Sequence, residues 1–322
     1  MAQQQGSNVS IIYQAEPAFK TTPTSGEAQI LPFVSESFRL NRNLISSNTI
    51  RSSRNPQSPV RGNMDVTGDL NFELAPQYGR LFRHIFGYYE SAASGEAYQH
   101  IFKIGQLPEG LCLEKRFTDL AVAKYFKYNG CRVNSFRMSA KSEGFVDCTV
   151  SLMGAKETVG NSSFNASVTD LGHTPFDGFE CTLKQGGVSV GIATQIDITL
   201  ENNLDGNTYV IDGTGERYSM PAGRAKVSGT LTCLFESTTM YELAVANTET
   251  SLELIFTKGT GAGTSGNERL TFYLPEIKFQ PQAPVVGGPQ GVVVELPFEA
   301  YYNDDAQASA LRAVLGSSTS VY

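Results

Sequence analysis

The sequence predicts an all-β protein with short flanking helices, organised as two related units in tandem. Charged residues make up only 18% of the 322 residues and glycine occurs 31 times, which is typical of turn-rich β proteins. Apolar and polar residues alternate along many short segments, the period of a strand with one buried face. A repeated order of strand, long loop, strand and helix indicates the two units.

The first 30 residues are rich in Gln, Thr, Pro and Ser. A single short apolar patch interrupts them, at Ile11, Ile12 and Tyr13. Terminal segments of this composition are poorly ordered unless something holds them. We therefore expect residues 1–30 to be an N-terminal arm that lies on a neighbouring surface and takes no part in the core.

Residues 35–74 are predicted to form a strand, a long basic loop and a second strand. Phe38 and Leu40 share one face of the first strand, and Val66, Leu70 and Phe72 share one face of the second. The loop between the strands carries Arg42, Arg51, Arg54 and Arg61. Its prolines and Gly62 prevent a long helix, so we expect an exposed, positively charged arm.

A short helix follows the second strand, because Pro76 can open it, apolar residues recur at helical spacing, and Gly87 can end it. Alternating segments then continue to residue 155. Between two of them, an Asn129-Gly130 pair predicts a tight hairpin. Residues 156–175 are rich in turn-forming residues and are predicted to be a linker.

The second unit, residues 176–303, repeats the first, residues 31–155. Val66-Thr-Gly68-Asp-Leu70 matches Val227-Ser-Gly229-Thr-Leu231 at an offset of 161. Thr239 and Glu242 then have the spacing of a helix capping box. Further on, Val150 and Leu152 match Val294 and Leu296 at an offset of 144. Chance similarity between alternating segments is the alternative explanation. Residues 304–322 predict a short C-terminal helix and tail.

Charge is segregated along the chain. The net charge is −7, yet residues 39–61 hold five arginines and no acid, which leaves −12 for the remainder. Such segregation favours contacts between copies of the chain. A solvated loop is the simpler alternative. A grip on nucleic acid would need aromatic residues among the arginines, and residues 39–61 contain none.

Motifs for catalysis or metal binding are missing from the sequence. The three histidines have no metal-binding spacing, no HExxH or GxSxG segment occurs, and the glycine-rich segment at 258–268 lacks the Lys-Ser/Thr ending of a phosphate loop. We expect no catalytic residues, no metal and no cofactor. The five cysteines are an odd number without CxxC spacing, which predicts buried free thiols. No apolar run reaches about 20 residues, so membrane insertion is not expected.

The chain resembles the tail tube proteins, or major tail proteins, of long-tailed non-contractile (siphovirus-type) bacteriophages. The resemblance covers residues 12–302 and is carried by SESFRLNRNLISSNTIRSSRNPQSPVRGNMDVTGDLNFEL, VDCTVSLMG, AKVSGTLTCLFESTTMYEL and VVVELPFEAYY. It implies a β-sandwich or barrel subunit without catalytic residues. Such subunits form rings that stack into the tail tube, which a tape-measure protein occupies during assembly and through which double-stranded DNA leaves the capsid. It also implies synthesis in the host bacterial cytoplasm and residence in the virion.

Two sets of residues are the candidate functional sites under this resemblance. The candidate lumen-facing acids are Asp69, Glu73, Glu295 and Glu299; a solvated outer face is the competing interpretation. Arg42, Arg51, Arg54 and Arg61 are expected to reach acids on the next ring. Because family rings present six tube domains, two domains per chain favour a trimer with pseudo-sixfold symmetry over a hexamer. Alternatives are the tube of a contractile tail or injection machine and, further away, a β-sandwich adhesin.

Overall fold

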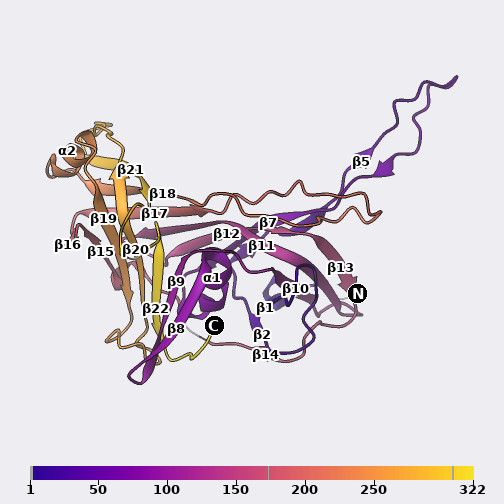
Figure 1. Cartoon of the computed structure of the whole chain (residues 1–322), viewed down its shortest axis with the longest axis horizontal. Helices are drawn as coiled ribbons and strands as arrows, with labels where there is room; N and C mark the ends of the chain where they lie inside the picture. The colour runs from indigo at the N-terminus through magenta and orange to yellow at the C-terminus, as the bar shows by residue number, and fades with distance from the viewer. Residues whose placement is uncertain (1–2, 173, 307) are drawn as a thin grey trace.

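The structure is a computed structural model that describes residues 3–172, 174–306 and 308–322. Within them, 20 strands pair into one continuous network, which we describe as three sheets. The strands of the first sheet run along the long axis of the molecule, and those of the second cross them steeply at one end (Figure 1). This strand-rich architecture confirms the all-β prediction.

The first sheet is antiparallel and carries the candidate acids. Its strands, in spatial order, are β3 (Ser35–Glu36) with β4 (Arg39–Asn41), β7 (Asp65–Glu73), β12 (Asp147–Gly154), β11 (Lys124–Lys141), β17 (Ala193–Glu201), β18 (Lys226–Leu234) and β21 (Val293–Tyr301). One face packs on the core and the other is polar, because apolar side chains alternate along each strand.

The other two sheets flank the first. The second contains β8 (Gly87–Ser94), β9 (Ala97–Ile104), β22 (Arg312–Ser317), β20 (Arg269–Phe279), β19 (Thr250–Thr257), β15 (Cys181–Gln185) and β16 (Val188–Ser189). The third contains β14 (Val168–Thr169), β2 (Ala28–Ile30), β1 (Ser10–Ala15), β10 (Leu111–Phe117), the first half of β11, and β13 (Lys156–Gly160). A separate hairpin is formed by β5 (Leu44–Ile45) and β6 (Val60–Arg61).

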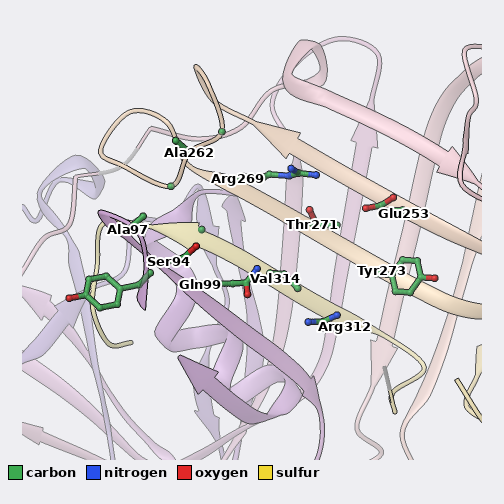
Figure 2. A pocket seen from close by; sticks show the side chains of 14 residues that line it. Ser94, Ala97, Gln99, Glu253, Ala262, Arg269, Thr271, Tyr273, Arg312 and Val314 are labelled. Carbon is green, nitrogen blue, oxygen red and sulfur yellow. The ribbon is translucent and has the colours of Figure 1, made fainter. Parts of the chain in front are cut away.

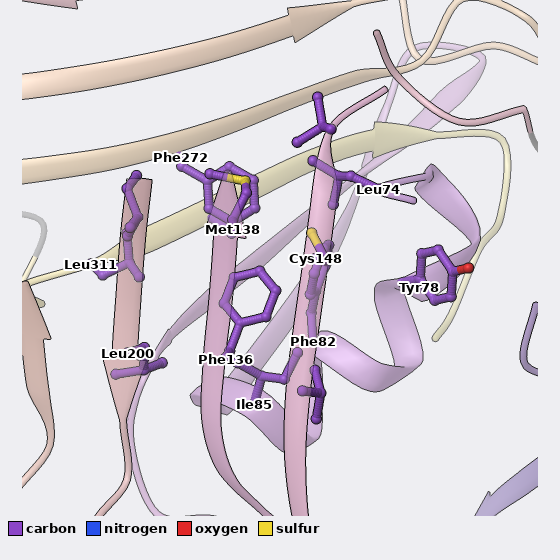
Figure 3. Close-up of a cluster of buried hydrophobic side chains, with 14 of the residues drawn as sticks. Leu74, Tyr78, Phe82, Ile85, Phe136, Met138, Cys148, Leu200, Phe272 and Leu311 are labelled. Atoms are coloured by element: carbon purple, nitrogen blue, oxygen red, sulfur yellow. The ribbon is translucent and has the colours of Figure 1, made fainter. Parts of the chain in front are cut away.

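The main helix fills the space between the first and second sheets. A 3₁₀ turn, η2 (Pro76–Tyr78), leads into α1 (Gly79–Phe86), which ends at Gly87 with a φ of 95° that glycine adopts without strain. Phe82 lies 6.2 Å from Phe136 and 6.0 Å from Phe272, ring centroid to ring centroid. Figure 3 shows these rings beside Cys148 and Leu200. The predicted helix is confirmed, and it joins both sheets into one core.

The remaining helical segments are short. They are α2 (Thr239–Val245), η1 (Gly6–Asn8) and η3 (Gly178–Glu180). The predicted capping box at Thr239 does not form: Thr238 is the N-cap residue, without a side-chain hydrogen bond to the backbone, and its hydroxyl donates to the Glu242 carboxylate at 2.6 Å. Neither α1 nor α2 approaches the length of a membrane-spanning helix, and none is found among the described residues.

The N-terminal prediction is wrong, because β1 belongs to the core. Ile11, Ile12 and Tyr13 are buried, and β1 pairs with β10 and β2. Tyr13 donates a hydrogen bond from its hydroxyl to Gln29 at 2.9 Å. The apolar segment here is too short, and alternates too little, to predict a strand. Pairing with segments distant in sequence stabilises β1, and composition alone does not reveal such pairing.

The hairpin predicted at Asn129-Gly130 is also wrong. The chain continues straight through as the 18-residue strand β11, which leaves the third sheet and enters the first at this point. Gly130 has a φ of 65°, and the register with β10 shifts beside it, as in a bulge. A residue pair suited to a turn is therefore used to redirect one strand between two sheets.

The predicted C-terminal helix is a strand, and the predicted linker contains two strands. Leu311, Ala313 and Leu315 alternate with more exposed residues and are fully buried, because β22 pairs with both β20 and β9. No helix follows Asp304 and Asp305 among the described residues of the C-terminal segment. Within residues 156–175, β13 pairs with β11 and β14 pairs with β2. His173 lies outside the described residues.

The two units have the same strand order across the first sheet and the adjoining end of β20. Strands β4, β7, β12 and β11 follow one another as do β17, β18, β21 and β20. Leu40 opposes Val66, and Leu200 opposes Val227, at equivalent positions. Val150 opposes Leu70 and Leu296 opposes Leu231, so the downstream offset is 146, not 144. The fall in the offset from 161 to 146 means that the first unit has 15 more residues over this span, and it is in this unit that the hairpin of β8 and β9 follows the helix α1.

Candidate assembly arm and acidic sheet face

The basic loop is a hairpin that projects from one end of the first sheet (Figure 1). Strands β5 and β6 close its base, where Leu44 opposes Arg61. We call residues 43–62 the arm. Its apolar side chains are unusually exposed: Leu44 at 70%, Ile50 at 97% and Val60 at 63%. An arm that holds this much apolar surface in water is suited to contact with a partner.

The four predicted arginines occupy different parts of the arm. Arg42, at the base, donates from Nε to the Gly62 carbonyl at 2.9 Å and from Nη2 to the Thr214 carbonyl at 3.2 Å. Arg51 donates to the carbonyls of Asn55 and Pro56 at 3.2 and 3.3 Å, within the tip. Arg54 and Arg61 are exposed. Arg42 therefore anchors the arm, whereas the other three leave charge available at its surface.

A second loop, residues 202–225, corresponds to the arm in the second unit. Leu204 opposes Ala222 at its base, as Leu44 opposes Arg61 in the arm. Unlike the arm, this loop is fixed to the first sheet. The Tyr209 hydroxyl donates to the Met64 carbonyl at 2.9 Å, and the Met64 amide donates to the Gly215 carbonyl at 2.7 Å.

Arg217 holds this second loop in place and is only 3% exposed. Its guanidinium donates to the carbonyls of Gly206 at 2.8 Å, Gly154 at 2.5 Å and Val66 at 3.2 Å, and it pairs with the carboxylate of Asp65. Gly206 belongs to the second loop itself, whereas Asp65 and Val66 are at the start of β7 and Gly154 is at the end of β12. Sequence reasoning missed Arg217, because only contacts between distant segments distinguish it from the other loop arginines.

The four candidate acids all lie on the polar face of the first sheet. Asp69 and Glu73 are on β7, and Glu295 and Glu299 are on β21, five strands away. Residues directly opposite in antiparallel strands share a face, so the register extends this face across the sheet. Its other charged residues are the acids Asp65, Asp147, Asp197 and Glu201 and the bases Arg39, Arg132, Arg137, Lys141, Lys226 and Lys278. Acids thus outnumber bases on this face.

Local contacts on this face are polar and exposed. The Ser151 hydroxyl donates to Asp69 at 2.6 Å, and Lys226 pairs with Glu299 at 3.5 Å, both of these side chains being more than half exposed. Exposed pairs of this kind contribute about 0–1 kcal/mol. The charged groups of this face therefore remain largely in contact with water, and its hydroxyl groups add to a hydrophilic surface.

A hollow of about 520 Å³ lies on the outer side of the second sheet. Figure 2 shows Arg269, Thr271 and Tyr273 along β20, with Arg312 on the neighbouring β22. Glu253 of β19 lies at its side. Among the described residues, no group of three or more potential metal-ligating side chains gathers anywhere.

Burial shifts the pKa of several groups elsewhere. It lowers the pKa of His84 to about 3, because the imidazole is enclosed and positively charged arginines lie nearby. Burial raises the pKa of Cys181 to about 12 and that of Cys233 to about 11, so both stay protonated. All five cysteines are free thiols; four are buried and Cys181 is partly buried.

Glu16 is the most perturbed acid outside this face. Its carboxylate accepts hydrogen bonds from the Gly130 amide, the Asn129 side chain and the Lys20 amide, each at 2.9 Å. Burial outweighs these bonds and raises the pKa of Glu16 to about 7. This contact fixes the segment after β1 to the bulge of β11.

A family model described as phage tail tube protein matches residues 6–300. The chain belongs to the phage tail tube protein family. Its members are structural components of the virion, and the strand-rich fold of this tail tube protein agrees with that role. A search of curated proteins finds no match to the chain.

Proposed function

We propose that this tail tube protein self-assembles into rings that stack into a tube, with the acidic face of the first sheet lining the channel for DNA. The single observation that carries the proposal is the common face of Asp69, Glu73, Glu295 and Glu299. The DNA passes without specific binding. A tape-measure protein occupies the same channel during assembly, and the tail is of the long, non-contractile type.

Electrostatics favours such a lining. Cationic walls would neutralise phosphates and release counterions, which holds DNA with an affinity that depends steeply on salt. An acidic, hydroxyl-rich wall repels the phosphates and lets the polymer slide. The sequence left the outer face as an equal alternative for these acids. The polar face is continuous over six strands and carries acids on β7, β12, β17 and β21. This supports a channel lining, because a channel needs an unbroken wall.

We also propose that each chain contributes two tube domains, residues 31–155 and 176–303, so that three chains complete a pseudo-sixfold ring. The support is the repeated strand order in the first sheet. The two units meet where β11 pairs with β17 from Ser135 to Lys141. If the contact between the two units is repeated between chains, β4 of the next chain takes the place of β17. The outer edge of β4 has no partner strand among the described residues.

Ring closure follows from the same edges. β21 pairs with β20 only from Phe298 to Tyr301, which leaves the segment from Val293 to Leu296 open on that side. Unpaired strand edges bind other edges, and a closed ring removes them. In the three-chain ring, the edge of β4 in one copy meets the open side of β21 and the end of β20 in the next.

Lysine substitutions on the acidic face test the proposed channel. Phage would be assembled with Asp69→Lys and Glu295→Lys, and with the matched control Glu90→Lys and Glu96→Lys, which makes the same charge change at exposed positions of the β8–β9 hairpin. We expect slower or incomplete DNA release only for the first variant, measured by dye fluorescence after triggering. Equal slowing in both variants would contradict the assignment of the lining.

A second test concerns stacking. Arg51→Glu with Arg54→Glu reverses the exposed charge of the arm tip and leaves Arg42 and the fold intact. We expect soluble, folded subunits or single rings without long tubes, as seen by electron microscopy. Long tubes from this variant would show that the arm does not connect rings.

A further inference from the structure

We propose that the arm of one copy docks on the opposite end of the first sheet in a copy of the next ring. This inference rests on the proposed stacking of rings. We call the receiving site the acceptor surface. It comprises the apolar side chains of Phe145, Phe179, Leu234 and Val293 and the acids Glu143 and Glu236.

The acceptor surface is exposed and apolar, as the arm is. The exposed fractions are 51% for Phe145, 84% for Phe179, 43% for Leu234 and 42% for Val293. Large apolar side chains gathered at one end of a soluble subunit indicate a contact surface. The arm offers the matching apolar groups, above all Ile50.

Backbone contacts bring these residues together from four segments. Phe145 forms an isolated β-bridge with Asp177, and the Gly178 amide donates to the Gly144 carbonyl at 3.0 Å. These two contacts hold Phe179 beside the loop that follows β11. On the other side, Leu234 opposes Val293 at the ends of β18 and β21. The amide of Ser142 donates to the carbonyl of Thr194 at 3.1 Å and closes the row between them.

A hollow lies beside the acceptor surface, between the ends of β11, β15 and β17. It has a volume of about 320 Å³, and its lining combines apolar residues such as Leu183, Val190 and Ala193 with polar ones such as Lys141 and Ser142. Interfaces derive most of their affinity from a few side chains that fill such hollows. Ile50, at the tip of the arm, is an apolar side chain of suitable shape, and the arginines that follow it would lie at the polar rim.

The register shows that arm and acceptor surface are at opposite ends of the first sheet. The arm joins β7 at Asp65, whereas the acceptor surface adjoins the other ends of the strands, at Lys141, Ala193 and Leu234. Contacts between opposite ends are heterologous and generate open, repeating stacks. The arm has about nine residues between its base and its tip. At roughly 3.3 Å per residue it reaches about 30 Å, which is similar to the length of the nine-residue strand β7.

Charge distinguishes this site from the other candidate. If the arm docked sideways as the second loop does, its tip would meet the residues equivalent to Met64 and Asp65. At the offset of 161 these are Ala225 and Lys226, next to the exposed Arg224. The arm has no acid to pair with Arg224 there, and Lys226 already pairs with Glu299. The acceptor surface carries exposed Glu143 and Glu236 instead, and it attracts Arg51 and Arg54.

Cross-linking between two variants tests this contact. Ile50→Cys in one preparation would be mixed with Phe179→Cys in another, so that only disulfides between copies can join the introduced thiols. Gln99→Cys, exposed on the outer face of the second sheet, is the matched control. The wild type gives the background from the native cysteines. Assembly is followed in parallel by electron microscopy.

We expect a cross-linked dimer at least tenfold more abundant with Phe179→Cys than with Gln99→Cys. Tubes that form without this excess would overturn the docking site and leave the proposed function intact. A failure of all variants and the wild type to form rings or tubes would overturn the proposed function and this inference together. Charge exchange provides a second measurement: Glu143→Arg with Glu236→Arg should restore tubes to the Arg51→Glu, Arg54→Glu protein.

Discussion

The Arg217 contact allows the most detailed prediction about stability. Replacing Arg217 by methionine keeps the apolar stem and removes the guanidinium. The carbonyls of Val66 and Gly154, both in buried residues, then lose their donor. Leaving a buried carbonyl unsatisfied costs about 1–3 kcal/mol. The Asp65 side chain is 50% exposed, so water solvates its carboxylate when the guanidinium is removed. The ion pair between Arg217 and Asp65 therefore contributes only about 0–1 kcal/mol.

We therefore expect Arg217→Met to lower the free energy of unfolding by about 3 kcal/mol, and Asp65→Asn by less than about 1 kcal/mol. The matched control is Arg224→Met, an exposed arginine of the same loop, with an expected effect near zero. Urea titrations at neutral pH measure all three free energies. Limited proteolysis should show new cleavage within residues 202–225 only in Arg217→Met.

Two results would refute this reasoning. If Arg217→Met costs no more than Arg224→Met, the second loop is held by its other contacts, such as those of Tyr209 and Gly215. If Asp65→Asn costs as much as Arg217→Met, the ion pair and not the carbonyl contacts supplies the stability.

Two further predictions concern Glu16 and Gly229. The folded-state pKa of Glu16, about 7, lies above its ordinary value of 4.5. The stabilisation of the fold by protonated Glu16 is therefore complete below about pH 4.5 and is lost as the pH rises to about 7. Urea titrations should show that the free energy of unfolding falls by on the order of 2–3 kcal/mol from pH 5 to 8, and Glu16→Gln should remove most of this pH dependence. An unchanged pH slope in Glu16→Gln would count against this. A Cβ at Gly229 would come within 3 Å of the Asp197 carbonyl and the Phe298 ring. Gly229→Ala should therefore lower the free energy of unfolding by about 1–3 kcal/mol. The control Gly291→Ala, whose Cβ would have no atom within 4 Å, should leave it unchanged in the same titrations.

Sequence patterns predicted the elements whose signal is local. Alternation around Val66 and Val227 identified β7 and β18, and helical spacing between Pro76 and Gly87 identified α1. Elements stabilised by distant pairing were missed or misassigned. β1 and β22 are short, and the residues around Leu311 fit a helix as well as a strand until their partners β20 and β9 are known.

The candidate sites divide in the same way. The basic arm and the acids of β7 and β21 could be predicted, because charge segregation and alternation are visible in the chain. That these acids share one face depends on β11, β12, β17 and β18 lying between them. Arg217 and the acceptor surface combine residues far apart in sequence, which no local pattern brings together.

Electron cryomicroscopy of tubes assembled from the purified protein tests the central claim most directly. The account predicts stacked rings of three chains with pseudo-sixfold symmetry, the face that carries Asp69, Glu73, Glu295 and Glu299 toward the channel, and the arm in contact with the next ring. Rings of six full chains, or a channel lined by the outer face of the second sheet, would contradict it.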